Sequence, residues 1–363
     1  METFSIVEAN PYFLPHLGGI ENRMHVTSKH LAKRGHDVTV LTAQLPGTPA
    51  EEDTEYGYRI VRVPSKFYNI YNPPYVTSRG VLEALESISP DIVNYNYRWA
   101  FSFDGEVSRY PGKKVFTYHN MWGEGVGYQR YISEANDALY RKKLDRYDHI
   151  VAVTDYVRND LIRRGIDPAK VTSVDNCLDT VPDISRTEGD FILSLGRLVA
   201  TKGLDYLIEA MRDVDYRLVI CGTGPEEKKI RKLISKFGLE GRVEVKGWVS
   251  EEEKNRLMDT CRFFVMPSIY ESYGLAALEV MSYGKPIVCT DVDGLPGNVK
   301  DAGLYVKPKD PKSLSEGINR LLSDEEYRRE LSDNALRVSR SVTWDQQIVK
   351  LEDLYRSVIL GEI

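Results

Sequence analysis

The feature that most constrains the fold is a regular alternation of short apolar segments with segments of helical period. In the first half of the chain, short segments rich in β-branched and aromatic residues occur at residues 4–9, 37–43, 91–95, 114–119, 149–154 and 170–176. In the second half they occur at residues 191–195, 217–222, 242–247, 262–268, 286–291 and 304–308. Strands that alternate with helices form parallel βαβ units, so each half is expected to fold as a doubly wound α/β domain.

A polar segment separates the two series. Residues 181–190 contain Pro182 and Gly189 and break the alternation, which indicates an interdomain linker. The last segment has the pattern of a separate amphipathic helix. A chain of 363 residues is also longer than one hydrophobic core usually supports, which favours two domains. The predicted parts are residues 1–180, 181–190, 191–342 and 343–363.

Composition argues against several classes of protein. The formal net charge of −6 provides no overall attraction to nucleic acid or to an anionic membrane. No apolar run approaches the roughly 20 residues of a membrane-spanning helix, and the first residues lack the pattern of a signal peptide, so a cytoplasmic location is expected. The four cysteines are Cys177, Cys221, Cys261 and Cys289. None are close in sequence and no CxxC occurs, which argues against a zinc site or a disulfide framework.

Three strand-to-helix turns in the second half carry residues suited to chemistry. The first, LGRLVATKG at residues 195–203, holds Arg197 and Lys202 between Gly196 and Gly203. The N–H groups and the dipole of the helix that follows favour an anion. A diphosphate suits the two cations, because Arg can bind two oxygens while Lys acts as a point charge. From this turn alone, a solvated loop with two exposed cations is an equally good interpretation.

The second turn, CGTGP at residues 221–225, also links a strand end to a helix, and Pro225 suits a first helical turn. Neither the P-loop pattern GxxxxGK[ST] nor the pattern GxGxxG occurs in the chain. The second half is therefore not expected to bind a nucleotide through either of these two glycine-rich motifs.

The third turn, YESYGLAALE at residues 270–279, places carboxylates on both sides of a predicted helix start. Glu271 is expected in the loop and Glu279 in the helix, with the N–H groups of Gly274 and Leu275 free at its first turn. Carboxylates accept hydrogen bonds from sugar hydroxyls, and free N–H groups bind phosphate oxygens. A nucleotide sugar fits this arrangement. The alternative is that Glu271 caps the helix and Glu279 faces solvent.

Together these motifs resemble the retaining glycosyltransferases of family four, which have the GT-B fold. The family sequences E-x7-E, G-R-x4-K-G and G-x-G-P are matched at residues 271–279, 196–203 and 222–225. Its N-terminal GGxE is matched at residues 18–21, and its strand-end histidine by His119. The resemblance spans nearly the whole chain. It implies two Rossmann-like domains facing across a cleft, with a C-terminal helix crossing back to the N-terminal domain.

The resemblance also implies roles for the matched residues. Arg197 and Lys202 would hold the donor diphosphate, Glu279 would bind the ribose hydroxyls, and Glu271 would bind the transferred sugar. His119 would lie beside that sugar at the reacting centre. The implied catalytic set is His119, Arg197, Lys202 and Glu271. The implied donor-binding set is Gly19, Gly196, Arg197, Lys202, Gly222, Trp248, Val249, Glu271, Tyr273, Gly274, Leu275 and Glu279.

The activity implied by the resemblance is the transfer of a hexose-type sugar, with retention and without a metal. The donor would be a nucleoside-diphosphate sugar, UDP- or GDP-linked, and the acceptor would be a glycan or a lipid-linked acceptor. No cofactor and no nucleic-acid partner are expected, and peripheral contact with the inner face of a membrane is left open. Two other interpretations remain. The chain would be another GT-B enzyme, such as a nucleotide-sugar epimerase or a sugar-phosphate synthase, or a non-catalytic nucleotide-sugar-binding protein.

The acceptor is expected to meet the N-terminal domain, which has aromatic stretches at residues 66–75, 94–101 and 118–131. Aromatic side chains beside polar groups suit the faces of sugars, and ordinary packing is an equal alternative.

The sequence departs from the family pattern at two places. Residues 176–179 read NCLD instead of NGVD, and Gly297 replaces a usual glutamate. Asp291 and Asp293 form a DxD, but the other matches explain this loop without a metal.

Overall fold

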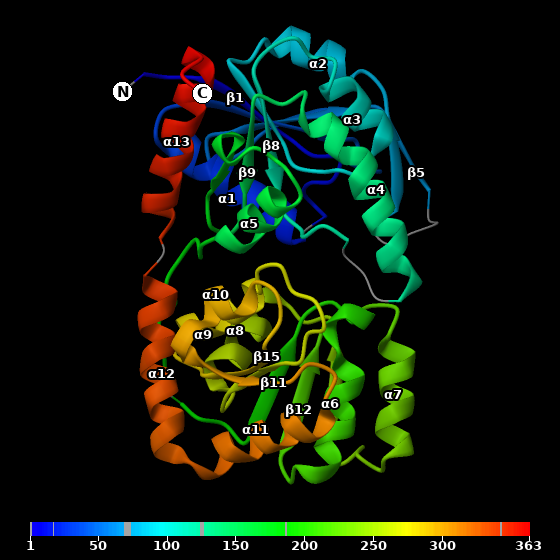
Figure 1. Ribbon diagram of the computed structural model, residues 1–363, viewed down its shortest axis with the longest axis vertical. Helices are drawn as coiled ribbons and strands as arrows, with labels where there is room; N and C mark the ends of the chain where they lie inside the picture. Colours follow the sequence, from blue (N-terminus) through cyan, green and yellow to red (C-terminus); the bar gives the residue numbers. More distant parts are fainter. Residues whose placement is uncertain (1, 17, 69–73, 124–126, 186, 342) are drawn as a thin grey trace. The chain divides into compact units, whose positions relative to one another are not determined.

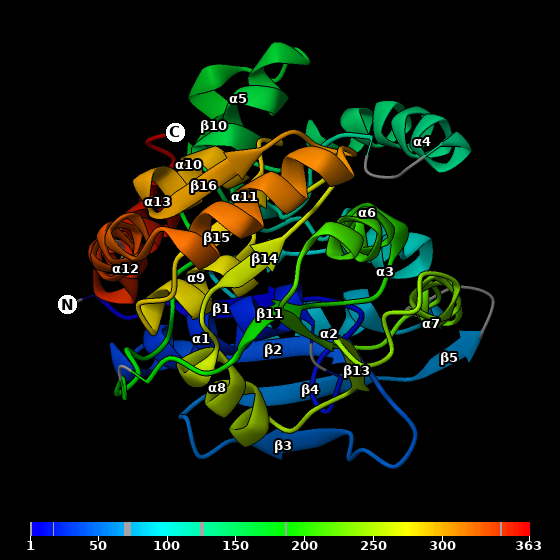
Figure 2. The ribbon, with the colours of Figure 1, turned by 90° about the horizontal axis from the view of Figure 1, so that it is seen from below.

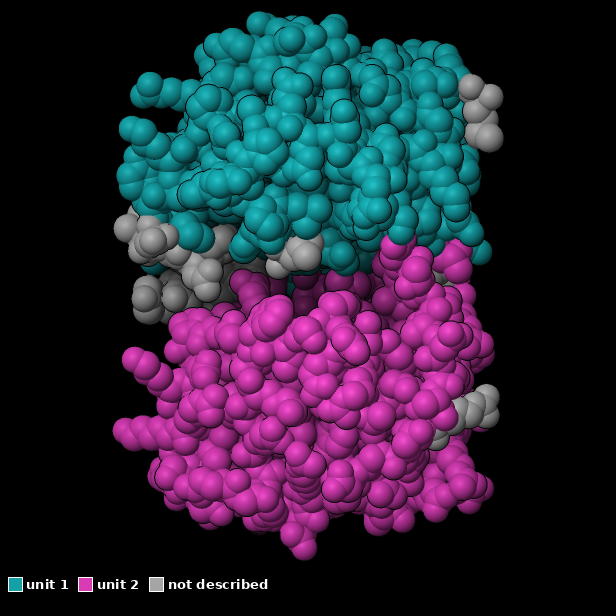
Figure 3. Space-filling view, turned by 180° about the vertical axis from the view of Figure 1, so that it is seen from behind, with its two compact units in different colours: residues 1–123, 131–176, 344–363 teal, residues 124–130, 177–343 magenta. Residues whose placement is uncertain are grey.

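The computed structural model describes residues 2–16, 18–68, 74–123, 127–185, 187–341 and 343–363. The chain divides into two compact units, which Figure 3 shows in different colours. Unit 1 comprises Met1–Gly123, Tyr131–Asn176 and Trp344–Ile363, and unit 2 comprises Glu124–Arg130 and Cys177–Thr343. The last helix, α13 (Trp344–Leu360), is therefore part of the N-terminal unit, as the resemblance implied.

Unit 1 is built on an eight-stranded sheet with the order β10-β9-β8-β7-β1-β2-β4-β3. All neighbours pair in parallel except β3 and β4. The strands are β1 (Ser5–Ala9), β2 (Asp37–Ala43), β3 (Glu51–Asp53), β4 (Arg59–Val63), β7 (Ile92–Tyr95), β8 (Lys114–Tyr118), β9 (His149–Ala152) and β10 (Val171–Ser173). A separate antiparallel pair joins β5 (Ser65–Tyr68) to β6 (Tyr75–Ser78).

Helices lie on both faces of this sheet (Figure 1). On one face, α1 and α13 pack against Ile6, Ile92 and Val115. On the other face, Phe103 of α3 stacks on Tyr95, and Tyr140 of α4 contacts Phe116. The helices wholly or mainly in this unit, besides α13, are α1 (Gly19–Lys33), α2 (Val81–Ile88), α3 (Phe101–Val107), α4 (Tyr128–Leu144) and α5 (Asp155–Arg163).

Unit 2 is built on a six-stranded, fully parallel sheet with the order β13-β12-β11-β14-β15-β16. Its strands are β11 (Phe191–Leu195), β12 (Arg217–Cys221), β13 (Val243–Gly247), β14 (Phe264–Met266), β15 (Ile287–Thr290) and β16 (Gly303–Val306). Each lies within or beside a segment predicted as a strand. The chain adds strands on one side of β11 and then returns to add β14 on the other. Ligands of open parallel sheets bind outside the carboxyl ends of the strands at such a reversal.

The helices of unit 2 also cover both sheet faces (Figure 2). One face carries α6, α7 and α11, the other carries α8, α9 and α10, and α12 contributes to both cores. The helices are α6 (Leu204–Ala210), α7 (Glu227–Lys236), α8 (Glu251–Thr260), α9 (Leu275–Ser282), α10 (Leu295–Val299), α11 (Pro311–Ser323) and α12 (Glu325–Arg340). Both units are thus doubly wound α/β structures, which confirms the predicted fold class.

The cysteines are buried free thiols, and Cys221, Cys261 and Cys289 lie in the core as expected for apolar strand neighbours. In the part of the chain that the structure describes, no helix has the length and apolar character needed to cross a bilayer.

Candidate functional site

The turns at the carboxyl edge of the unit 2 sheet are locked together through glycines. Gly222 has a φ of +132°, and a Cβ there would lie 1.9 Å from the carbonyl oxygen of Gly196. Gly203 has a φ of +62°, and a Cβ there would lie 2.2 Å from the carbonyl oxygen of Pro267. Only glycine tolerates these conformations at such close approach. The turns that follow β11, β12 and β14 are therefore fixed against one another.

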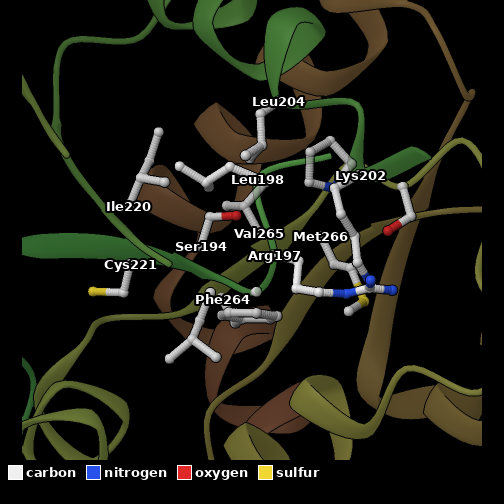
Figure 4. Close-up of a pocket in the computed structure, with 14 residues that line it drawn as sticks. Ser194, Arg197, Leu198, Lys202, Leu204, Ile220, Cys221, Phe264, Val265 and Met266 are labelled. Atoms are coloured by element: carbon white, nitrogen blue, oxygen red, sulfur yellow. The ribbon is translucent and has the colours of Figure 1, made fainter. Parts of the chain in front are cut away.

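A small pocket opens at this edge, where β11 and β14 are neighbours (Figure 4). Its wall includes Gly196, Arg197 and Lys202 from the first turn and Ser268 from the turn after β14. Arg197 is exposed, and no hydrogen bond or ion pair of the described residues uses its guanidinium. Figure 4 shows the Arg197 and Lys202 side chains extending toward the same side of the view. The pocket edge thus carries two cations from one turn, as the sequence predicted.

Glu271 lies in the loop between β14 and α9, and it is held on several sides. Its carboxylate forms an ion pair with Lys202, and it accepts a hydrogen bond of 3.4 Å from the Ser268 hydroxyl. Its backbone N–H donates to Asp293 Oδ2 at 3.1 Å, and its carbonyl accepts from the N–H of Gly294 at 3.1 Å. Glu271 is therefore held against Lys202 and Ser268, which line the pocket. The alternative that it caps α9 is wrong, because the N-cap position is Gly274, with no side-chain cap.

The start of α9 has the free donors that the sequence predicted. Gly274 adopts a left-handed φ of +80°, and the helix begins at Leu275. Among the described residues, no hydrogen bond uses the backbone N–H of Gly274 or Leu275. Tyr273, just before the helix, is buried, and its carbonyl accepts a hydrogen bond from the Asn298 side chain. These two N–H groups are available to an anion.

Glu279 lies inside α9 and is not simply solvated. Its side chain is 23% exposed, and its Oε1 is 3.3 Å from Lys254 Nζ. Burial raises the pKa of Glu279, and the charge of Lys254 opposes that rise. Lys254 also contacts Glu251 at 2.7 Å. The alternative that Glu279 merely faces solvent is therefore wrong.

Two more residues of the predicted donor-binding set follow β13. The Trp248 side chain is 77% exposed, whereas Val249 packs against the core beneath α8 and α9. Within unit 2 the structure thus brings Arg197, Lys202 and Glu271 together. Glu279 lies on the same helix whose start Gly274 and Leu275 form.

The remaining predicted residues, Gly19 and His119, belong to unit 1. Gly19 is the first residue of α1, and a Cβ there would meet nothing within 4 Å. His119 follows β8 directly, and its Nε2 is 2.9 Å from Asn96 Oδ1. Burial, reinforced by Arg23 and Arg98, holds the pKa of His119 well below its usual value. The neutral form of His119 is therefore favoured.

Sequence reasoning missed Asn96 and Asp293 as supports of the predicted site. Asn96 follows two positions after Asn94 at the end of an apolar strand, and this polar alternation was the available signal. Asp293 belongs to the DxD that was set aside. Its φ is +47°, and its carboxylate accepts the hydrogen bond from the Glu271 N–H. In the described ranges, no group of three or more His, Cys, Asp or Glu side chains is arranged to hold a metal ion.

The aromatic stretches of unit 1 divide between packing and surface. Tyr95 and Tyr118 are buried, in keeping with ordinary packing, whereas Phe101 and Tyr131 are exposed. Residues 69–73 and 124–126, which fall within two of these stretches, lie outside the described residues.

Comparison with known proteins gives consistent matches. Two family models match the chain: "Glycosyltransferase Family 4" at residues 17–181 and "Glycosyl transferases group 1" at residues 182–338. An uncharacterized glycosyltransferase of Methanocaldococcus jannaschii, MJ1178, is 33% identical over 58% of this chain, and the match spans 60% of its own length. A phosphatidylinositol N-acetylglucosaminyltransferase protein of Arabidopsis thaliana is 27% identical over 88% of this chain and 74% of its own. O-antigen chain mannosyltransferase C of Escherichia coli is 26% identical over 96% of each chain.

Solved structures share the fold. Sucrose-phosphate synthase from Thermosynechococcus elongatus superimposes with a TM-score of 0.82 at 20% identity, over 98% of this chain and 99% of that one. Anabaena Alr3699/HepE, solved in complex with UDP and glucose, gives a TM-score of 0.79 at 17% identity, over 98% and 100%. At these identities the likeness concerns the arrangement of the chain alone.

Proposed function

Because the chain belongs to the group 1 glycosyltransferases of family 4 and has the GT-B fold, we propose that it transfers a hexose-type sugar from a nucleoside-diphosphate sugar to a glycan or lipid-linked acceptor. The proposal includes retention at the anomeric carbon and no requirement for a metal or cofactor. UDP- and GDP-sugars are the proposed donors, and the UDP in the Anabaena complex supports the first of these.

The observation that carries the proposal is the grouping at the unit 2 sheet edge. Arg197 and Lys202 come from one turn, and the free N–H groups of Gly274 and Leu275 begin α9. Cations and a helix N-terminus are the two protein features best suited to a diphosphate. Arg197, whose guanidinium no described contact engages, is available to bind two phosphate oxygens at once. Gly196 and Gly222 are proposed to let the phosphates approach the backbone.

The carboxylates of Glu271 and Glu279 are proposed to accept hydrogen bonds from the two sugars of the donor. Glu271, fixed by Lys202 and by the Asp293 loop, would accept hydrogen bonds from hydroxyls of the transferred sugar. Glu279 would accept from the ribose hydroxyls, as acidic residues do in dinucleotide folds. Backbone at Trp248 and Val249 would receive the base. Tyr273 completes the proposed donor-binding set.

In the proposed mechanism, negative charge grows on the diphosphate as the glycosidic bond breaks. Arg197, Lys202 and the α9 N-terminus stabilise that charge, and the loss of one comparable donor costs roughly 3–4 kcal/mol in analogous sites. The leaving phosphate assists in removing the acceptor proton on the same face, so no side chain acts as nucleophile. In unit 1, Gly19, the first residue of α1, would allow the backbone there to approach the diphosphate closely, and neutral His119 would contact the sugar.

The acceptor is proposed to meet unit 1, and the names of the Arabidopsis and Escherichia coli relatives support a lipid-linked or glycan acceptor. Helix α4 supports peripheral membrane contact at the cytoplasmic face, because its polar Ser133 and Asp137 are buried while large apolar side chains near its start are exposed. Between residues 131 and 142, the exposed positions are Tyr131, Ile132, Ala135, Ala138, Leu139, Arg141 and Lys142. These exposed positions include two cations and no acid, and Glu134 is partly buried.

Vesicle flotation tests the membrane contact. The protein should float with vesicles that contain phosphatidylglycerol, and Tyr131→Ser with Leu139→Ser should abolish this, whereas Val349→Ser, an exposed apolar position on α13, should not. Failure of the unmodified protein to float would contradict the contact.

The activity is tested by incubating the full chain with UDP- and GDP-sugars, with and without glycan or lipid-linked acceptors. We expect nucleoside diphosphate release that depends strongly on acceptor, a product with the donor's anomeric configuration by NMR, and no loss of rate with a chelator. Interconversion of the donor sugar without acceptor would instead indicate an epimerase. Donor binding without turnover for any acceptor would indicate a binding protein.

A further inference from the structure

A buried carboxylate in unit 1, Glu8, is surrounded entirely by hydrogen-bond donors. Asn94 Nδ2 donates to its two oxygens at 3.1 and 2.9 Å, and Asn96 Nδ2 donates to Oε2 at 3.0 Å. The Tyr355 hydroxyl of α13 donates to Oε1 at 2.9 Å. Glu8 is 1% exposed. A buried carboxylate is costly unless it is well hydrogen-bonded. Burial raises the pKa of Glu8, and the hydrogen bonds from Asn94, Tyr355 and Asn96 oppose that rise by stabilising the carboxylate.

The sheet register explains how these groups meet. Glu8 of β1 pairs with Asn94 of β7, and their side chains share the face on which Ile6 and Ile92 pack against α1 and α13. Tyr355 approaches from α13 on that same face and is fully buried. β1 and β7 are adjacent although far apart in sequence, which makes their carboxyl ends the strand-order reversal of unit 1.

This arrangement fixes the orientation of the Asn96 amide. Asn96 Nδ2 faces a Glu8 oxygen and, at 3.3 Å, the carbonyl oxygen of Asn94. Carbonyl oxygens only accept hydrogen bonds, and the Glu8 carboxyl oxygens accept four hydrogen bonds from three donor groups. The amide nitrogen must therefore lie on that side. Asn96 Oδ1 then faces His119 Nε2, at 2.9 Å.

The protonation of His119 follows from this orientation. An amide oxygen can only accept, so Nε2 of His119 must carry a hydrogen. Burial together with Arg23 and Arg98 disfavours the charged imidazolium, which leaves Nδ1 with a lone pair. Among the described residues, no hydrogen bond uses Nδ1. His119 and Asn96 also line a small pocket together with Ile20, Thr117 and Asn120.

We propose that Asn96 and Glu8 are positioning residues that hold His119 as the Nε2–H tautomer, so that Nδ1 accepts a hydrogen bond from a hydroxyl of the substrate. The identity of that hydroxyl as a sugar hydroxyl rests on the proposed function. His119 then orients the sugar by accepting a hydrogen bond at Nδ1, and it donates no proton to the leaving group. The C-terminal helix takes part through Tyr355, although it is the last element of the chain.

The tautomer can be read by two-bond ¹H–¹⁵N correlation spectra of the full chain labelled with ¹⁵N-histidine, because protonated and bare ring nitrogens resonate apart. His119→Gln identifies the His119 signals by their disappearance. At neutral pH we expect a protonated Nε2 and a bare Nδ1. An Nδ1–H tautomer, or a charged ring, overturns the proposal.

Two variants then test whether Asn96 and Glu8 determine the tautomer of His119. Asn96→Leu removes the acceptor, and Glu8→Gln removes the acceptor-only partner that orients Asn96, so each should give a mixture of tautomers. Glu352→Gln is the matched control: Glu352 is a carboxylate of α13 that is 3% exposed and contacts Arg34 and His36 outside this network. It should leave the His119 signals unchanged. If Asn96→Leu does not fold, Glu8→Gln decides. An unchanged tautomer in a folded Asn96→Leu or Glu8→Gln variant overturns the proposal.

Kinetics separate this proposal from the proposed function. In Asn96→Leu we expect kcat to fall by roughly tenfold or more, as expected for a misplaced contact, with the donor KM changed far less. A kcat equal to that of the unmodified protein would contradict the positioning role. The NMR result requires no turnover, so a correct tautomer in a protein that transfers no sugar refutes the proposed function and leaves the positioning intact.

Discussion

At the scale of single residues, the ion pair of Lys202 with Glu271 is expected to matter more for catalysis than for folding stability. Their side chains are 24% and 12% exposed, and Lys202 lines the pocket at the edge of the sheet. Ion pairs near the surface contribute about 0–1 kcal/mol to folding, whereas a cation aimed at developing charge contributes several kcal/mol to catalysis. The larger effect of removing Lys202 is therefore expected on turnover.

Lys202→Met keeps the length of the side chain and removes its charge. We expect kcat to fall about 10²–10³-fold, because one donor to the diphosphate is lost in the transition state. Steady-state kinetics with a thermal melt measures both effects, and the melting temperature should change little. Lys232→Met, an exposed lysine of the same unit, is the control and should behave as the unmodified protein. Full activity of Lys202→Met would refute the diphosphate role.

Glu279→Gln should weaken donor binding about tenfold, since a neutral amide is a poorer acceptor for two ribose hydroxyls than a carboxylate. Calorimetric titration with the donor nucleotide measures this. Glu251→Gln is the matched control, because Glu251 shares Lys254 with Glu279 but is 74% exposed. An unchanged affinity in Glu279→Gln would exclude the ribose assignment.

At the scale of elements, the sequence predicted strands well where both faces are covered. All residues of β14 and β15 are buried, and such apolar runs are typical of parallel sheets between helix layers. The sequence missed β3, β4, β5 and β6. The three residues of β3 are acidic and exposed, and β5 alternates between partly buried and exposed positions. Strands such as β3 and β5 have no apolar run to identify them. β4 reads RIVRV and is mostly buried between β2 and β3, so its apolar residues were an available signal.

The candidate site shows the same division. Motifs that are local in sequence, such as Arg197 with Lys202, could be predicted because one turn carries them. The Glu8, Asn96 and Tyr355 group could not, because strand order and the return of α13 bring together residues that are up to 347 positions apart. Polar residues inside apolar strands were the local sign, but their partners depend on topology.

The junction of β9 with β10 predicts a pH dependence of stability. His149 is buried with its Nε2 2.9 Å from Thr172 Oγ1, and burial, with Lys170, lowers its pKa to about 4. The unfolded chain, with an ordinary pKa near 6.5, binds more protons between these two values, so the contribution is complete above about pH 6.5 and is lost as the pH falls toward 4. The full loss is on the order of 3 kcal/mol.

Denaturant unfolding at several pH values between about 4 and 7 tests this. His149→Gln should have a shallower pH dependence than the unmodified protein, whereas His16→Gln, at an exposed position, should not. Parallel curves for His149→Gln and the unmodified protein would contradict the prediction.

At the scale of the whole molecule, each unit carries a strand-order reversal with predicted site residues near it. Unit 2 has Arg197, Lys202 and Glu271 at the junction of β11 and β14, and unit 1 has His119 beside the junction of β1 and β7. We therefore propose that unit 2 recognises the donor, whereas unit 1 orients the sugar and contacts the acceptor.

Because a ligand that binds only the native state stabilises it by mass action, a donor at 100 times its Kd should add about 2.7 kcal/mol to the stability of the full chain. A thermal-shift screen of UDP-, GDP- and ADP-sugars should therefore raise the melting temperature for one nucleotide class above the others. We expect UDP or GDP to be that class, and an exclusive response to ADP-sugars would contradict the proposed donors.

The most direct test of the central claim is a crystal structure of the full chain with the nucleotide sugar that this screen selects. The account predicts the diphosphate within hydrogen-bonding distance of Arg197, Lys202 and the N–H groups at the start of α9, with the ribose at Glu279. A nucleotide bound elsewhere, or a diphosphate that contacts neither Arg197 nor Lys202, would contradict it.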